Sequence, residues 1–315
     1  MRKALIVGIN SYPTSPLTGC VNDANAMATI LESHGDGAPN FGIKIMTSPS
    51  LNITKSVLRE AIEHLFTGDS DMALLYFSGH GFIKSTGGYL VTVDARKYDE
   101  GISMDDVLIL ANQSKAKNRV IILDCCHSGA LGSPSITNNS ISQLSEGLSV
   151  LTASRDNETA LEVNGSGIFT SLVVDALKGG AADLRGNITP SSLYAYVDEA
   201  LGAWDQRPIF KTNVTSFAPL RRISPKIPFE TMRKITKYFI TPDTEFQLNP
   251  TYEDTEPSAI ADNVTIFKDL QKFQSTGLVV PVDAEFMYFA AVNSKSCRLT
   301  ALGYQYWRLV NEKKL

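Results

Sequence analysis

The sequence predicts an α/β protein with a mostly parallel sheet, followed by a second, smaller domain. Short apolar segments alternate with amphipathic segments over the first two thirds of the chain, and this pattern stops near residues 221–230. Continuous apolar segments such as "KALIVGI" are typical of strands buried on both faces, and helices between such strands make the sheet parallel. We therefore place the two domains at residues 1–222 and 226–315.

The expected elements of the first domain alternate in order along the chain. Strands are predicted at 3–9, 41–47, 71–79, 118–126 and 148–154, and helices at 22–35, 54–68, 105–115, 169–180 and 189–202. Asn22 or Asp23 is expected to cap the first helix. Sheets of this kind bind ligands at the carboxyl ends of their strands. Two conspicuous segments, "YFSGHGF" and "LDCCHSGA", lie at such ends.

The second domain is predicted to begin after a basic, proline-containing linker, "RRISPKIPFE". Helices are expected near 228–239, 263–277 and 300–314, with a hairpin of strands at 278–283 and 285–292. This order resembles a winged-helix module on its pattern alone. Residues 221–315 carry 13 Lys and Arg against 11 Asp and Glu. That excess is small for a nucleic-acid surface, so a regulatory or partner-binding role is favoured over DNA binding.

Composition limits the classes of function. The chain has 315 residues, a net charge of −4 and 43% hydrophobic residues. This charge disfavours whole-chain binding to nucleic acid or to an anionic membrane. No apolar segment approaches the roughly 20 residues that span a bilayer, so no membrane contact is expected. Four cysteines in this length do not make a disulfide framework, which favours a reducing, cytoplasmic location.

A histidine and a cysteine pair at two strand ends predict nucleophilic catalysis. A thiol attacks a carbonyl well only as a thiolate, so it needs a base and donors for the developing oxyanion. His80 lies between two glycines, and the thiols of Cys125 and Cys126 come just before a Ser and a Gly. A metal site is not predicted, because Cys125, Cys126 and His127 are adjacent and cannot all converge on one tetrahedral ion.

Four further motifs accompany "YFSGHGF" and "LDCCHSGA" along the chain. They are "ALIVGINSYPTSPLTGCVNDA", "LTASRDNETALE", "GSGIFTSLVVDAL" and "QRPIF". Together, over about residues 3–218, the motifs resemble the caspase-like cysteine peptidases of the metacaspase and orthocaspase group. A His about 50 residues before the Cys is also the order of caspases. The resemblance implies a caspase-hemoglobinase-like fold and a cysteine endopeptidase; it does not cover 225–315.

The resemblance assigns the catalytic residues. The nucleophile of the family directly precedes "HSG", which makes it Cys126 here, with His80 as its base in a Cys–His dyad. Gly81 is a candidate oxyanion donor. Cys125 is then expected to be a buried core thiol.

The resemblance also assigns the pocket for the residue before the cleaved bond. Its acids correspond to Asp23 and Asp124, with Cys20 and Ser78 beside them. Two carboxylates pair with a guanidinium or an ammonium group, so cleavage after Arg or Lys is expected. An alternative is that Asp23 only caps its helix.

Calcium and partners are implied less specifically. Many metacaspases need calcium, and Asp105 and Asp106 lie where the family often carries an acidic pair. Calcium takes about six to eight oxygen ligands, and the sequence does not supply them, so action without a metal or cofactor is expected. The implied partners are protein substrates and an activating protease or regulatory protein, in a stress, cell-death or antiviral programme. The alternative function is a DNA-binding or scaffolding regulator whose caspase-like domain serves mainly for binding.

Overall fold

The structure is a computed structural model that describes residues 1–84, 87–125, 144–153, 162–163, 165–201 and 208–315. The chain divides into two compact units. The larger contains Met1–Ala182 and Asn187–Ile223, and the smaller contains Asp183–Gly186 and Ser224–Leu315. The main connection between them, after Ile223, falls in the gap between the predicted domains 1–222 and 226–315.

A six-stranded sheet forms the centre of the larger unit, in the order β12-β8-β7-β3-β1-β2. Its strands are β1 (Arg2–Gly8), β2 (Gly42–Thr47), β3 (Met72–Ser78), β7 (Asn118–Asp124), β8 (Leu148–Thr152) and β12 (Ile209–Asn213). Neighbours are parallel, except that β12 is antiparallel to β8. The predicted α/β fold with a mostly parallel sheet is confirmed, and β12 is an addition that the sequence did not indicate.

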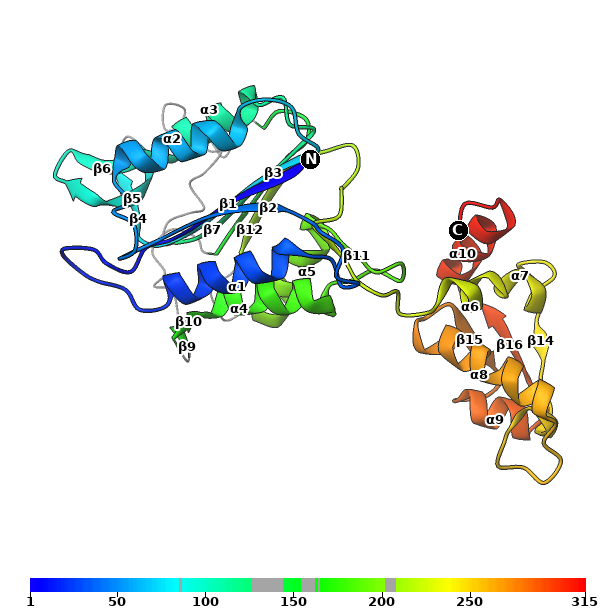
Figure 1. The fold of residues 1–315 in the computed structure, drawn as a ribbon. Helices are drawn as coiled ribbons and strands as arrows, with labels where there is room; N and C mark the ends of the chain where they lie inside the picture. The colour runs from blue at the N-terminus through cyan, green and yellow to red at the C-terminus, as the bar shows by residue number, and fades with distance from the viewer. Residues whose placement is uncertain (85–86, 126–143, 154–161, 164, 202–207) are drawn as a thin grey trace. The chain divides into compact units, whose positions relative to one another are not determined.

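Helices cover both faces of this sheet (Figure 1). One face carries α2 (Lys55–Phe66) and α3 (Met104–Gln113); the other carries α1 (Cys20–Glu32), α4 (Ile168–Asp175) and α5 (Pro190–Leu201). Successive strand residues point to opposite faces. Leu75 and Phe77 therefore lie in the core on the α2/α3 face, whereas Leu74 and Tyr76 lie in the core on the α1/α4 face. Each buried apolar side chain of this size contributes about 1.5–3 kcal/mol to the transfer free energy of folding.

The first helix begins differently from the prediction. Its N-cap is Gly19, no side chain caps it, and Asn22 and Asp23 both lie inside its first turns. The helix ends at Glu32, before the predicted stop. The hypothesis that Asp23 serves only as a helix cap is therefore wrong, and its carboxylate is directed into the interior instead.

A small antiparallel sheet follows β3 directly and was not predicted. Its strands are β4 (Gly81–Lys84), β5 (Gly87–Arg96) and β6 (Asp99–Ser103), in that order. Glycines and charged residues interrupt its apolar pattern, so the period of two that marks a strand is weak here. Val91 and Val93 of β5 pack against the core of the α2/α3 face.

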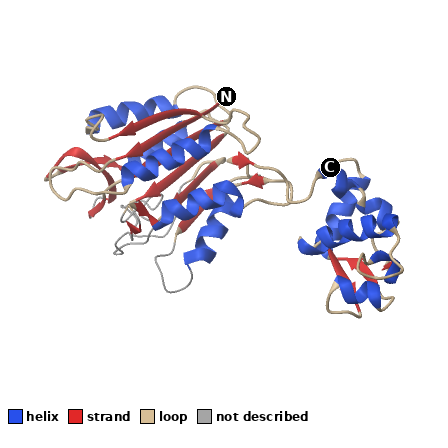
Figure 2. Cartoon of the chain, turned by 60° about the horizontal axis from the view of Figure 1, so that its bottom comes forward, coloured by secondary structure: helices blue, strands red, loops and turns tan. Residues whose placement is uncertain are grey.

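The smaller unit packs helices around a three-stranded antiparallel sheet in the order β14-β16-β15 (Figure 2). Its elements are α6 (Phe229–Arg233), α7 (Ile235–Tyr238), β14 (Phe246–Gln247), α8 (Ala261–Ser275), β15 (Val279–Val282), α9 (Met287–Val292), β16 (Ser296–Leu299) and α10 (Ala301–Asn311). The predicted helices are present, the first one divided at Lys234. Within the described residues of the chain, no helix is both long and apolar enough to cross a membrane.

The predicted hairpin of the smaller unit is wrong. Residues 285–292, expected as its second strand, form helix α9 instead, and β15 pairs with the later strand β16. The helix buries Met287, Ala290 and Ala291, the i, i+3, i+4 spacing of a helical face. A short apolar run does not distinguish the two structures by itself. The winged-helix resemblance stays a prediction.

The basic residues near the connection differ in exposure. Arg221 is buried, and its guanidinium donates to the carbonyls of Ser33 and Leu177, at 2.9 Å each. Arg221 and Arg222 form strand β13, which pairs with β11 (Asn187–Ile188). Arg221 is therefore not part of an exposed linker, whereas Arg222 and Lys226 are exposed.

Candidate active site

The register of the sheet brings the two predicted motifs to one edge. Ser78 at the end of β3 pairs with Gly8 of β1 on one side and with Asp124 of β7 on the other. His80 follows Ser78 by two residues, and Cys126 follows Asp124 by two residues. Cys126 itself lies outside the described residues. The end of its strand and the His80 turn are neighbours.

The two predicted pocket acids lie on the α1/α4 face of the sheet. Asp23 is 2% exposed and Asp124 is 6% exposed. Asp23 accepts hydrogen bonds from the Gly167 amide, at 3.2 Å to each carboxylate oxygen, and from the Ser78 hydroxyl at 3.3 Å. Ser78 is buried, and Cys20 is buried one turn before Asp23 on α1. The structure thus places all four predicted pocket residues in one buried region.

A chain of hydroxyl groups holds Asp124. The Thr170 hydroxyl of α4 donates to Asp124 Oδ2 at 2.6 Å, and the Tyr76 hydroxyl lies 2.6 Å from the same Thr170 oxygen. All three side chains are buried. A buried carboxylate that accepts a short hydroxyl hydrogen bond is fixed in orientation. Neither Thr170 nor Tyr76 was predicted as part of the site, because nothing local marks a core threonine or tyrosine as a partner of a distant acid.

Gly167, just before α4, brings the two carboxylates together. A Cβ at this position would lie 2.8 Å from Asp124 Oδ2 and 3.3 Å from Asp23 Oδ2. Any larger residue would therefore displace at least one of the acids. Glycine is required here by space, and both acids contact the same short piece of backbone.

The pKa of Asp23 is far above the ordinary value of an aspartate. Burial and repulsion from Asp124 together raise the pKa of Asp23 to about 7, against the hydrogen bonds from Gly167 and Ser78. Near neutral pH this carboxyl is therefore partly protonated. A cation placed between the acids would favour the ionised form of Asp23.

His80 is held at the sheet edge by the loop after β1. Its Nε2 lies 2.7 Å from the Ser15 carbonyl oxygen, and its ring centroid is 4.6 Å from that of Tyr12. The Tyr12 hydroxyl accepts from the His80 amide at 3.0 Å and donates to the Val91 carbonyl at 3.2 Å. Tyr12 and Ser15 were not predicted. Their place in a proline-rich loop after the first strand, at the same edge, was the only signal.

Gly81 faces away from its neighbouring strand. The Val91 amide donates to the His80 carbonyl, so His80 and Val91 are a hydrogen-bonded position of the β4–β5 ladder. The next position pairs Gly81 with Leu90. In an antiparallel ladder such positions alternate, and the Gly81 amide consequently points away from β5.

Cys125 behaves as the sequence predicted. It is 2% exposed and belongs to the core on the α2/α3 face with Phe77 and Leu123. Ordinary packing explains its presence.

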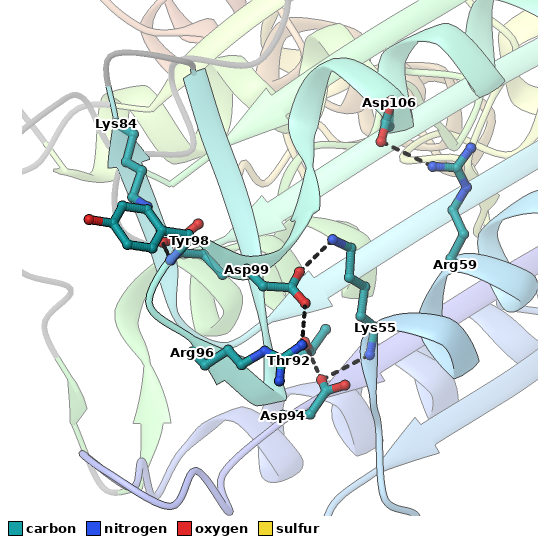
Figure 3. A network of polar contacts seen from close by, with 10 residues as sticks. Lys55, Arg59, Lys84, Thr92, Asp94, Arg96, Tyr98, Asp99 and Asp106 are labelled. Carbon is teal, nitrogen blue, oxygen red and sulfur yellow. Dashed lines mark hydrogen bonds and ion pairs between the residues drawn. The ribbon is translucent and has the colours of Figure 1, made fainter.

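A cavity of about 730 Å³ adjoins His80. Its apolar lining includes Tyr12, Phe82, Val91 and Val93, and charged residues of the β4–β6 sheet form its rim. At this rim the Lys84 ammonium pairs with Glu100 and lies 5.3 Å from the centre of the Tyr98 ring (Figure 3). No feature of the sequence predicted this cavity.

Cationic side chains pair with carboxylates in the region of the expected acidic pair. Asp106 pairs with Arg59 at 3.0 Å, and nearby Asp99 pairs with Lys55 at 2.6 Å (Figure 3). Cationic side chains therefore already occupy these carboxylates. Among the residues that the structure describes, no group of three or more His, Cys, Asp or Glu side chains is arranged to hold a metal ion.

Comparison with solved structures identifies the same architecture elsewhere. A protein from Geobacter sulfurreducens is 17% identical, with a TM-score of 0.52 over 71% of this chain and 97% of its own. Caspase-1 from Spodoptera frugiperda is 12% identical, with a TM-score of 0.51 over 70% of this chain and 90% of its own. At such identities the likeness shows the fold alone. No curated protein matches significantly.

The sequence family is decided by a direct match. The model of the caspase domain matches residues 1–218, which covers the larger unit up to the end of its sheet and both motifs at the sheet edge. Over these residues the chain belongs to the caspase-domain family of cysteine peptidases.

Proposed function

We propose that the protein is a cysteine endopeptidase that cleaves proteins after Arg or Lys. The observation that carries this proposal is the buried pair of Asp23 and Asp124 beside the His80 turn. The partners of Asp23 are a backbone amide, hydroxyl groups and a second carboxylate. Two acids that share one buried region bind a guanidinium or ammonium group and repel an acidic side chain.

The proposed nucleophile is Cys126, with His80 as its base. The Ser15 carbonyl accepts one proton of the His80 ring when that proton is on Nε2, which leaves Nδ1 able to take the thiol proton. Ser15 has a positive φ of 68°, and this strained backbone directs its carbonyl toward the imidazole. A carbonyl thus replaces the orienting acid found in many triads, and a Cys–His dyad suffices.

The chemistry follows in two balanced steps. The Cys126 thiolate attacks the peptide carbonyl, and protonated His80 gives its proton to the leaving amine as the C–N bond breaks. Water then releases the acyl group from sulfur and restores the thiol. The Gly81 amide, directed away from β5, supports its proposed role as an oxyanion donor.

Cofactor, location and regulation belong to the same proposal. We propose action without a metal or cofactor, in the cytoplasm, on protein substrates. The smaller unit would regulate the enzyme or bind a partner, such as an activating protease, in a stress, cell-death or antiviral programme. DNA binding by this unit is the alternative, and the 13 basic against 11 acidic residues of 221–315 give that alternative little support.

Fluorogenic peptides ending in Arg, Lys or Asp test the proposal directly. Wild-type protein should cleave the first two, and Cys126→Ala or His80→Ala should lower kcat/KM by at least about 1,000-fold. Cys125→Ala is the matched control and should retain most activity. Preference for Asp-ending peptides, or activity that depends on Cys125 instead of Cys126, would contradict it. A duplex-DNA shift assay on the same sample tests the alternative.

A further inference from the structure

We propose that the cavity beside His80 binds the substrate segment that follows the cleaved bond. It would take an apolar side chain directly after the cut and favour an acidic residue at the next position. This inference rests on the proposed function, because the acid pair defines which side of His80 receives the residue before the cut.

The acid pair and the cavity lie on opposite faces of the sheet. Ser78 and Asp124 continue the alternation that places Tyr76 on the α1/α4 face, and they contact Asp23 and Thr170 there. The cavity is lined by residues of the other face. Tyr12 belongs to the α2/α3 core, and Val91 and Val93 pack against it. His80 lines the cavity at the shared edge.

Proton transfer to the leaving amine also places the residue after the cleaved bond next to His80, on the side of the cavity. A protease histidine must deliver its proton to the nitrogen of the leaving amine, within hydrogen-bond reach. The residue that carries this nitrogen therefore lies against His80. With the preceding side chain bound to the acids on one face, the chain after the cut continues toward the face that holds the cavity.

The walls and rim determine which residues fit. Tyr12, Phe82, Val91 and Val93 provide an apolar interior, and a volume of about 730 Å³ exceeds one side chain, so two successive residues fit. The rim holds three cationic side chains, Lys84, Arg96 and Lys97, against one acid. Lys84 is paired with Glu100, and the Arg96 side chain, 80% exposed, lies 3.8 Å from the Asp99 carboxylate, which is not part of the lining. The remaining positive charge favours an acidic residue at the second position.

The experiment uses quenched peptides that are identical up to the cleaved Arg. Three of them continue with Leu-Glu, Gly-Glu or Leu-Lys, and a fourth substrate carries only aminomethylcoumarin after Arg. Cleavage after Arg is quantified by mass spectrometry of the products, because the Lys of the third peptide is itself a possible cleavage site. The full-length protein should cleave the Leu-Glu peptide about tenfold faster, in kcat/KM, than either of the other two peptides, since a filled apolar subsite discriminates by about this factor or more.

Two variants test the cavity itself. Ala95 is exposed and lines the cavity, so Ala95→Trp should fill it and remove the Leu-over-Gly preference. Ala38→Trp, at an exposed position before β2 at the opposite end of the sheet, is the matched control and should keep the preference. Arg96→Glu should remove the Glu-over-Lys preference, whereas Lys44→Glu, on the exposed edge strand β2, should not.

A binding measurement separates this inference from the proposed function. A product peptide with a free amino-terminal Leu-Glu should bind Cys126→Ala protein, and Ala95→Trp in the same background should weaken that binding about tenfold. Failure to cleave Arg-aminomethylcoumarin would contradict the proposed function. Absence of Leu-Glu binding, or preferences that Ala95→Trp and Arg96→Glu leave unchanged, would overturn the subsite.

Discussion

A buried aspartate of the larger unit, Asp23, and a buried aspartate of the smaller unit, Asp269, have opposite surroundings. Asp23 in the larger unit is 2% exposed, and Asp269 in the smaller unit is 4% exposed. Asp269 accepts from the Lys234 ammonium at 2.9 Å, the Tyr238 hydroxyl at 2.8 Å and Lys272 at 3.4 Å. Asp23 instead faces a second carboxylate, with neutral donors around it.

The pKa values of the two acids move in opposite directions. Burial acts to raise the pKa of Asp269, but hydrogen bonds from Lys234 and Tyr238 outweigh it and the pKa is lowered. Burial and the charge of Asp124 raise the pKa of Asp23 to about 7. An acid whose cations are supplied by its own unit stabilises the fold. An acid placed against another acid costs stability, and we infer that its cation comes from a substrate.

The largest effect expected from this contrast is on catalysis. Asp23→Ala or Asp124→Ala should reduce kcat/KM for Arg peptides by a factor of roughly 30 to 5,000, since truncating a buried partner of a charge costs about 2–5 kcal/mol. Steady-state kinetics would measure this. Exposed Asp69→Ala is the control. Unchanged Arg cleavage in both acid variants would break the comparison.

The next effect is on the stability of the smaller unit. Asp269→Ala should lower its free energy of unfolding by about 2–3 kcal/mol, because the Tyr238 hydroxyl and the Lys234 ammonium lose their acceptor. The chain has two tryptophans. In a Trp204→Phe background, urea titration followed by Trp307 fluorescence reports on this unit alone. The exposed Glu285→Ala should change stability by less than about 0.5 kcal/mol, and an equal loss in both variants would refute the assignment.

The pH dependence of stability should have opposite signs for the two acids. The folded-state pKa of Asp23 lies above its ordinary value of 3.8, so its contribution is fully present below pH 3.8 and is lost as the pH rises through about 7. The contribution of Asp269, whose pKa is lowered, is present above pH 3.8 and is lost on further acidification.

Asparagine variants make this difference measurable. Asp23→Asn should be more stable than wild type at pH 8, and the difference should shrink as the pH falls toward 4. Asp269→Asn should be less stable than wild type at pH 8, and that difference should shrink only below pH 4. Urea unfolding of both variants and wild type between pH 8 and about pH 2.5 would show both changes. Differences of the same sign would mean that the two sites are alike.

The smallest expected effect concerns the support of Asp124. Thr170→Val keeps the shape of the side chain but removes the hydroxyl that donates to Asp124 and contacts Tyr76. It should raise KM for Arg peptides severalfold, with less effect on kcat, and cost about 1–2 kcal/mol of stability. Thr170→Ser retains the hydroxyl and should behave like wild type. Equal loss in both variants would point to packing instead of the hydrogen bond.

Periodicity within single segments predicted most of the larger unit. Buried strands such as β3 and β7 have continuous apolar sequences, and parallel strands necessarily end at one edge. The meeting of the His80 turn with the end of β7 could therefore be predicted. The burial of Cys125 followed from the alternation of side chains along the same strand. The spacing of apolar residues did not distinguish a strand from a helix at residues 285–292. An apolar segment of eight residues is compatible with either structure, and the protein forms helix α9 there.

The family, the order of the motifs at the strand ends and the acids at this edge can be predicted from the sequence alone, because each motif consists of residues close together in the chain. The groups that hold these residues in place are known only from the folded structure. The Ser15 carbonyl reaches His80 across 65 residues, and the Gly167 amide reaches Asp23 across 144. Such contacts arise when separate loops and helices pack on one sheet, and no local pattern encodes the partner. For the same reason the cavity beside His80 became visible only once the β4–β6 sheet was placed beside the Tyr12 loop.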